Sequence, residues 1–125
     1  MDVQTASPVV LIERLYAASL RHTRIAREAQ GDPRRRGESV SRVISIVGEL
    51  RQSLSFERGG EIAANLDALY GYVTERLAQG NRGDARAFDD VLGVLAPLHD
   101  AWTQLAARPE AELVAAVEAD AREQE

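Results

Sequence analysis

The side chains best suited to metal chemistry in this sequence are its two histidines, His22 and His99. Helical bundles that bind two iron ions carry Glu-x-x-His on two helices, so each histidine needs a glutamate three positions earlier. Ser19 and Ala96 stand at those positions, and there is no cysteine to act as a thiolate ligand or nucleophile. We therefore interpret both histidines as core or surface residues and expect no metal and no cofactor.

Two carboxylates, Glu57 and Glu61, flank the pair Gly59-Gly60 and are the remaining candidates for acid and base catalysis. That chemistry needs a partner group within hydrogen-bond reach. No histidine or oxyanion-stabilising donor is close to them in the sequence, and no phosphate-binding loop or nucleophile elbow occurs. The sequence predicts that the protein is not an enzyme and has no catalytic residues.

Charge is distributed unevenly along the chain, which has a formal net charge of -5. All of it resides in residues 110–125, because the acidic residues and arginines of 1–109 cancel. A neutral body does not attract nucleic acid, and the run Arg34-Arg35-Arg36 lacks aromatic neighbours on which bases stack, so we interpret it as a solvated helix turn. No run is long and apolar enough for a membrane span or resembles a signal peptide, so we expect no membrane insertion and a cytoplasmic protein.

Apolar residues recur at steps of three and four along the chain, which is the period of amphipathic helices. Helices are expected over about 8–30, 33–54, 61–79 and 84–107, with a weak acidic helix over 110–122. Ser7-Pro8 and Asp32-Pro33 are typical helix starts. Because the connections are short, neighbouring helices must be antiparallel. The sequence therefore predicts an all-α, up-and-down four-helix bundle over 1–109 and an acidic helical tail over 110–125.

Two apolar residues lie on helix faces away from the main stripe of apolar positions, Ile46 in the second helix and Tyr72 in the third. One interpretation is that they are ordinary exposed apolar residues, which are common on protein surfaces. The other is a hydrophobic groove between the second and third helices, flanked by Phe56, that binds amphipathic helices of another chain. The pattern alone favours neither.

Three blocks of residues resemble, in order and spacing, those of a known family. The first helix opens with Thr5-Ala6-Ser7-Pro8, Leu11-Ile12 and Leu15-Tyr16. The centre has Ile46-Val47-Gly48-Glu49-Leu50, Ser53-Leu54, Gly59-Gly60-Glu61-Ile62-Ala63, Asn65-Leu66, Leu69-Tyr70, Tyr72 and Arg76-Leu77, and the fourth helix has Asp100-Ala101-Trp102. Together they resemble the flagellin export chaperones, the bacterial flagellar secretion chaperones, over most of the chain.

The resemblance implies a chaperone without ATP chemistry. Members of the family hold the disordered C-terminal part of flagellin, stop its premature polymerisation and present it to the flagellar export apparatus. In this family the glycine pair forms the tight turn between the second and third helices. The chain departs from the family pattern in two places: only four residues precede Thr5, and Gly71 replaces a polar helix former, which weakens the helix by about 1 kcal/mol relative to alanine.

The resemblance and the apolar pattern together predict a client-binding region across the second and third helices. Its residues are Ile46, Leu50, Leu54, Phe56, Ile62, Asn65, Leu66, Leu69, Tyr70, Tyr72 and Val73. An alternative hypothesis is a helical-bundle adaptor that binds another partner through its acidic tail or by self-association. A related chaperone with a different client and the oligomeric state are both left open by the sequence.

Overall fold

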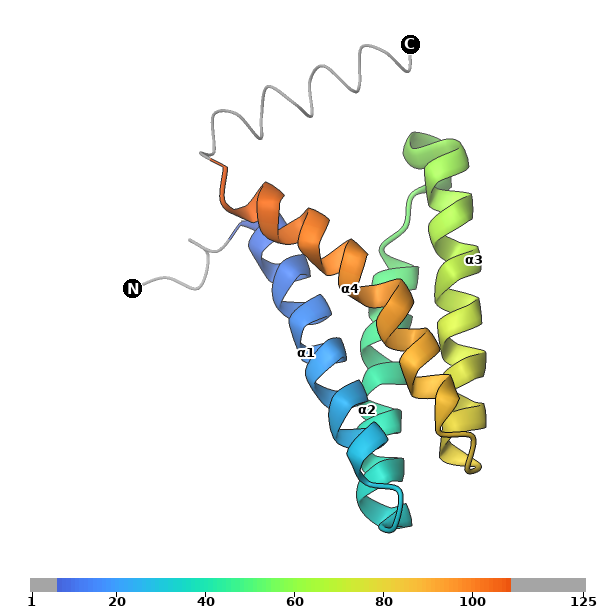
Figure 1. Cartoon of the computed structure of the whole chain (residues 1–125). Helices are drawn as coiled ribbons and strands as arrows, with labels where there is room; N and C mark the ends of the chain where they lie inside the picture. The colour runs from blue at the N-terminus through green and yellow to red at the C-terminus, as the bar shows by residue number, and fades with distance from the viewer. Residues whose placement is uncertain (1–6, 109–125) are drawn as a thin grey trace.

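The computed structural model describes residues 7–108 of the chain. It contains four helices, α1 (Pro8–Glu28), α2 (Pro33–Gln52), α3 (Phe56–Asn81) and α4 (Arg86–Ala106). Successive helices are antiparallel, and α4 returns to contact α1, which closes a ring of four (Figure 1). The predicted all-α, up-and-down bundle is confirmed, whereas the acidic helix expected over 110–122 lies outside the described residues. No helix in the described range is long and apolar enough to span a membrane.

The first two helices begin where the sequence predicts, at capping residues followed by proline. The Ser7 side chain accepts a hydrogen bond from the Val10 backbone N–H at 3.2 Å, and Asp32 accepts one from Arg35 at 3.1 Å. These oxygens satisfy N–H groups that have no partner inside the helix. Local chemistry therefore defines both starts without help from tertiary packing.

The connection between α2 and α3 differs from the expectation that the glycine pair forms it. The chain turns at residues 53–55, and the Ser55 side chain caps α3 by accepting from the Arg58 N–H at 3.4 Å. Gly59 and Gly60 lie inside α3, where Gly60 has φ 50° and ψ -120° and kinks the helix. Only glycine adopts that conformation at low cost. The pair is therefore a kink one turn into α3, because the Ser55 cap has already started the helix.

The core consists of large side chains from all four helices. The largest fully buried ones are Tyr16, Val43, Val47, Val73, Leu77, Phe88, Val91 and Leu95. Each such residue contributes about 1.5–3 kcal/mol by leaving water. Two buried hydroxyls in α1 are satisfied locally, because Ser19 and Thr23 donate to backbone carbonyls one turn earlier at 3.0 and 2.7 Å.

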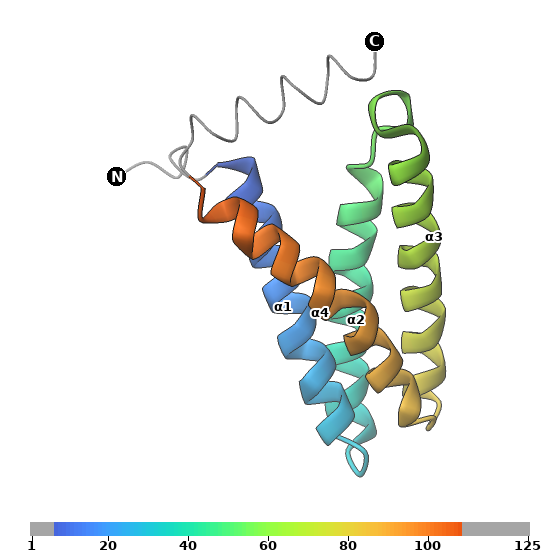
Figure 2. The same cartoon turned by 45° about the horizontal axis from the view of Figure 1, so that its top comes forward.

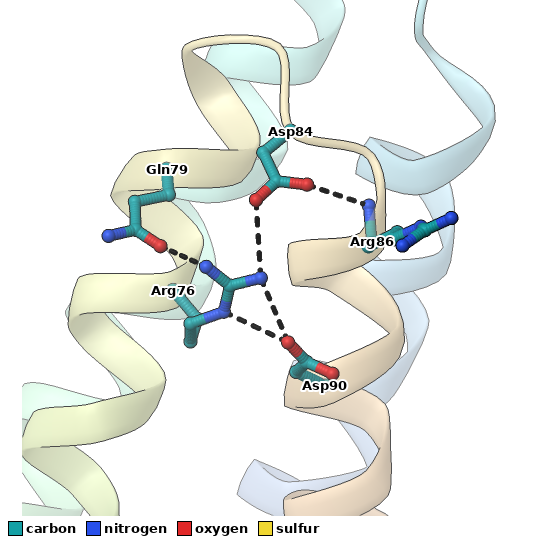
Figure 3. Close-up of polar contacts among 5 residues, drawn as sticks. All are labelled: Arg76, Gln79, Asp84, Arg86 and Asp90. Carbon is teal, nitrogen blue, oxygen red and sulfur yellow. Dashed lines mark hydrogen bonds and ion pairs between the residues drawn. The ribbon is translucent and has the colours of Figure 1, made fainter.

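One end of the bundle, which we call the closed end, is tied together around the turn between α3 and α4. Figure 3 shows the Arg76 guanidinium reaching Asp90 at 2.8 Å and Asp84 at 3.3 Å, with Gln79 as a further acceptor. Asp84, where the fourth helix was expected to begin, accepts a hydrogen bond from the Arg86 N–H at 3.2 Å, and α4 begins at Arg86. These contacts hold α4 close to α3 at this end.

The opposite end, which we call the open end, contains the start of α1, the connection between α2 and α3, and the last turns of α4. Both views show α4 crossing diagonally from α3 at the closed end to α1 at the open end (Figures 1 and 2). The His99 ring contacts the Glu13 carboxylate at 2.7 Å, which joins α4 to α1 there. Because α4 leaves α3, the side of α3 that faces α4 is uncovered toward the open end.

Candidate functional site

The open end contains a hollow of about 340 Å³ that all four helices line. Its lining residues are Ile12, Leu50, Ser53, Leu54, Ser55, Arg58, Gly59, Ile62, Ala63, Leu66, Tyr70 and Trp102. Most of them are apolar, and Arg58 is the one charged residue among them. A concave apolar surface of this kind suits the side chains of a bound peptide or helix.

A row of exposed apolar side chains continues from this hollow along α3. We define the α3 stripe as Ile62, Leu66, Leu69 and Tyr72. Ile62 is 65% exposed, Leu69 37% and Tyr72 44%, and these are large values for apolar residues. Their spacing of three and four places them on one side of the helix.

The later residues on the same side of α3 show that the α3 stripe faces toward α4. Arg76 lies seven residues after Leu69, which is two helical turns, and contacts Asp90 of α4. Val73 is fully buried, although it is only one turn beyond Leu69. The stripe is therefore the part of the α4-facing side that α4 leaves uncovered as it crosses to α1.

A pair of tyrosines forms the floor beneath this surface. The hydroxyls of Tyr16 in α1 and Tyr70 in α3 are 2.5 Å apart, and the Tyr16 ring stacks on Trp102 of α4 at a centroid distance of 6.4 Å. Burial raises the pKa of both hydroxyls, and the hydrogen bond with Tyr70 raises that of Tyr16 further. Both groups therefore stay neutral at physiological pH, and the pair links α1 to α3 without offering acid or base chemistry.

The structure divides the predicted client-binding residues into three sets. Ile46, Leu50, Tyr70 and Val73 are buried, Leu54 and Leu66 are half-buried, and Phe56, Ile62, Asn65, Leu69 and Tyr72 are exposed. The expectation that Ile46 lies away from the core was wrong, because it is only 9% exposed and belongs to the core cluster. Ile46→Asp would therefore introduce a charge into the core and test folding, not binding.

Sequence reasoning missed the two residues of the hollow that α1 and α4 contribute. Ile12 belongs to the first helix, and Trp102 was assigned to the apolar stripe of the fourth helix. Their membership depends on how far α1 and α4 spread at the open end, which no local pattern encodes. The available signal was the resemblance, whose blocks include Ile12 in Leu11-Ile12 and Trp102 in Asp100-Ala101-Trp102.

The residues with potential for chemistry take structural or exposed positions. His99 pairs with Glu13, and the His22 pKa is lowered by burial and then by the nearby positive charges of Arg21 and Arg42. Glu57 and Glu61 are exposed at the rim of α3. Within residues 7–108 no group of three potential metal-ligating side chains comes together.

The sequence of this bundle matches that of a known protein family. The family model described as "Flagellar protein FliS" matches residues 1–109, which is most of the chain. The chain belongs to the FliS family. The resemblance inferred from the sequence blocks is thereby confirmed, and residues 110–125 lie beyond the part that this family model matches.

Curated relatives of the FliS family agree with this assignment. The flagellar secretion chaperone FliS of Salmonella typhimurium is 43% identical over 108 residues, covering 82% of this chain and 79% of the relative. The flagellar secretion chaperone FliSB of Pseudomonas aeruginosa is 36% identical, covering 81% and 82%. The flagellar secretion chaperone FliS of Vibrio cholerae is 32% identical, covering 83% and 79%. This FliS-family bundle is therefore related to flagellar secretion chaperones.

Proposed function

We propose that this chain is a cytoplasmic, ATP-independent chaperone that binds the disordered C-terminal segment of flagellin. It prevents premature polymerisation and delivers its client to the flagellar export apparatus. The observation that carries the proposal is the exposed α3 stripe beside the apolar hollow, on a bundle of the FliS family. An exposed contiguous apolar surface on a folded domain marks a site of interaction.

The energetics of a disordered client favour a surface of this shape. Ordering the client costs about 1–2 kcal/mol per backbone residue, and coupled folding and binding typically buries on the order of 1,000–3,000 Å². At about 25 cal/mol per Å² of apolar surface, an extended contact offsets that cost and a compact pocket does not. The stripe from Ile62 to Tyr72 has a length of about 15 Å, which matches roughly three turns of a client helix.

The experiment uses a peptide of the C-terminal flagellin segment and isothermal titration calorimetry. Ile62→Asp and Leu69→Asp introduce charge into the stripe at exposed positions, so the fold stays intact while the apolar contact is lost. Each lost apolar contact of about 1.5–3 kcal/mol weakens binding by roughly 10- to 100-fold. Circular dichroism confirms that helix content is unchanged.

Ala64→Asp is the matched control, because Ala64 is exposed on the same helix but lies outside the stripe. It adds the same charge to α3 and is expected to leave the affinity near that of the unsubstituted chain. If all three variants bind the flagellin peptide equally well, the stripe is not the client site and the proposal fails.

A further inference from the structure

The four helices divide their charge into two opposite sides, although the body as a whole is neutral. Helices α1 and α2 contain nine arginines and four acidic residues, whereas α3 and α4 contain three arginines and seven acidic residues. Because neighbours in the ring are α1 with α2 and α3 with α4, the bundle has a basic side and an acidic side. The net charge of residues 1–109, which is zero, does not reveal this separation of charge between the two sides.

On the basic side, exposed arginines stand on both sides of the seam between α1 and α2. We define the basic face as Arg14 and Arg21 of α1 with Arg35 and Arg42 of α2, each pair two helical turns apart. All four are exposed, and within residues 7–108 none of them forms an ion pair. Arg21 and Arg42 lie close to His22, whose pKa is lowered by burial and then by these two positive charges.

The seam between α1 and α2 contains a mostly polar cleft in which Ile25 is the one apolar side chain. The cleft has a volume of about 250 Å³ and is lined by His22, Ile25, Arg35, Glu38, Ser39 and Arg42. Glu38 pairs with Arg34 at 3.3 Å, so its charge is already compensated on its own helix. Toward the open end, Leu11 of α1 is 49% exposed. The face thus combines unpaired positive charge with apolar side chains.

Residues 110–125 have the complementary chemistry. They contain six acidic residues and one arginine, together with the apolar residues Leu113, Val114 and Val117. They follow α4, whose last turns lie beside the first turns of α1, as the contact between His99 and Glu13 and both overall views show (Figures 1 and 2). A helix over residues 109–125 would be about 25 Å long, and the distance along α1 from Pro8 to Arg21 is about 20 Å, so the segment would reach Arg21 with its acidic end and place its apolar residues over the first turns of α1.

We propose that the acidic segment 110–125 docks across the basic face, with its carboxylates on Arg21 and Arg42 and its apolar residues beside Leu11 of α1. The alternative position, the α3 stripe, lies on the acidic side, where a segment of net charge -5 is repelled. Docking on the basic face leaves the stripe open, so the segment and a client bind independently. This inference does not depend on the proposed function.

The test exploits the absence of cysteine from the chain. Ala116→Cys places a single thiol in the tail for a nitroxide label, and paramagnetic broadening of the ¹⁵N amide signals locates the tail on the bundle. Broadening is expected around Arg21 and Arg42 at 0.01 M salt, where the Debye length is about 30 Å, and recovery at 1 M, where it is about 3 Å. Broadening concentrated at the α3 stripe, or none at all, overturns the proposal.

Paired variants separate specific docking from a general effect of charge. Arg21→Gln with Arg42→Gln is expected to lower the docked population by about 2- to 25-fold, since each exposed ion pair contributes a factor of about 1.5 to 5. Arg82→Gln with Arg86→Gln makes the same change of net charge at the closed end and is expected to leave the broadening unchanged. Glu112→Gln with Glu118→Gln repeats the test from the tail without altering the bundle.

A mixed sample distinguishes the chain's own tail from that of a second copy. Spin-labelled chain without ¹⁵N is combined with ¹⁵N-labelled chain that has no label, so broadening reports only contacts between molecules. We expect none. Broadening in this sample, or equal effects of the two arginine variants, would refute docking of the tail on its own bundle.

Discussion

The tyrosine pair beneath the hollow leads to a prediction in which two substitutions compensate each other. Tyr70→Phe removes the partner of the Tyr16 hydroxyl, which is fully buried and cannot reach bulk water. A buried hydroxyl left without a partner costs about 1–3 kcal/mol. Tyr16→Phe is expected to cost less, because Tyr70 lines the hollow and its hydroxyl regains a partner from water there.

The double variant removes both hydroxyls and leaves two aromatic rings in contact. Replacing both partners of a buried hydrogen bond with apolar groups is close to neutral, so we expect the double variant to be at least 1 kcal/mol more stable than the sum of the single changes. Near the midpoint, a loss of about 1–3 kcal/mol lowers the Tm of a domain of this size by roughly 4–24 °C.

The assay is urea unfolding followed by far-ultraviolet circular dichroism and by the fluorescence of the single tryptophan, Trp102, which stacks on Tyr16. Tyr72→Phe is the matched control, because it removes a hydroxyl from an exposed tyrosine of the same helix and should change stability by less than about 0.5 kcal/mol. The reasoning is refuted if Tyr70→Phe costs no more than Tyr72→Phe, or if the double variant loses the full sum of both single changes.

Three further predictions concern pH, backbone and tail. Burial raises the folded-state pKa of Tyr16 and Tyr70 above the unfolded value of 10.0. The stabilisation that this shift contributes is therefore fully present below pH 10 and declines as the pH rises further. Unfolding free energies measured from pH 8 to 11 should fall more steeply for the unsubstituted chain than for the double phenylalanine variant. Gly60→Ala should destabilise the fold by about 1–2 kcal/mol because Gly60 has a positive φ. Gly48 is helical and has open space where alanine would add a Cβ, so Gly48→Ala should stabilise the fold by up to about 1 kcal/mol. Equal Tm shifts of the two variants in thermal melts would contradict this. Deleting residues 110–125 should leave flagellin affinity unchanged in calorimetry, while loss of binding would favour the adaptor hypothesis.

The helices of this protein were predictable because their determinants are local. The side-chain oxygens of Ser7 and Asp32 lie next to the N–H groups that they cap. The spacing of apolar residues that predicts each helix is likewise contained within a few turns of that helix. Short connections then left only an antiparallel bundle. The family followed from residue identities at matching spacing, which likewise needs no knowledge of packing.

The glycine pair shows where local evidence is ambiguous. Two adjacent glycines are compatible with a turn or with a kink, and both use the freedom of a residue without a side chain. The position of the Ser55 cap, one turn before Gly59, decides for a kink, because it starts α3 ahead of the pair. A serine in such a polar stretch can cap a helix or lie in a turn, so the sequence did not separate the two.

Which apolar residues of α3 stay exposed was decided by tertiary structure alone. Leu69 and Val73 are one turn apart and belong to the same apolar pattern, yet Leu69 is 37% exposed and Val73 is fully buried. The difference arises because α4 is held to α3 by Arg76 at the closed end and joined to α1 through His99 at the open end. The spacing of apolar residues in the sequence predicts which side of a helix is apolar. Whether that side contacts another helix or the solvent depends on the distance between the helix axes. Contacts between residues far apart in the sequence determine that distance.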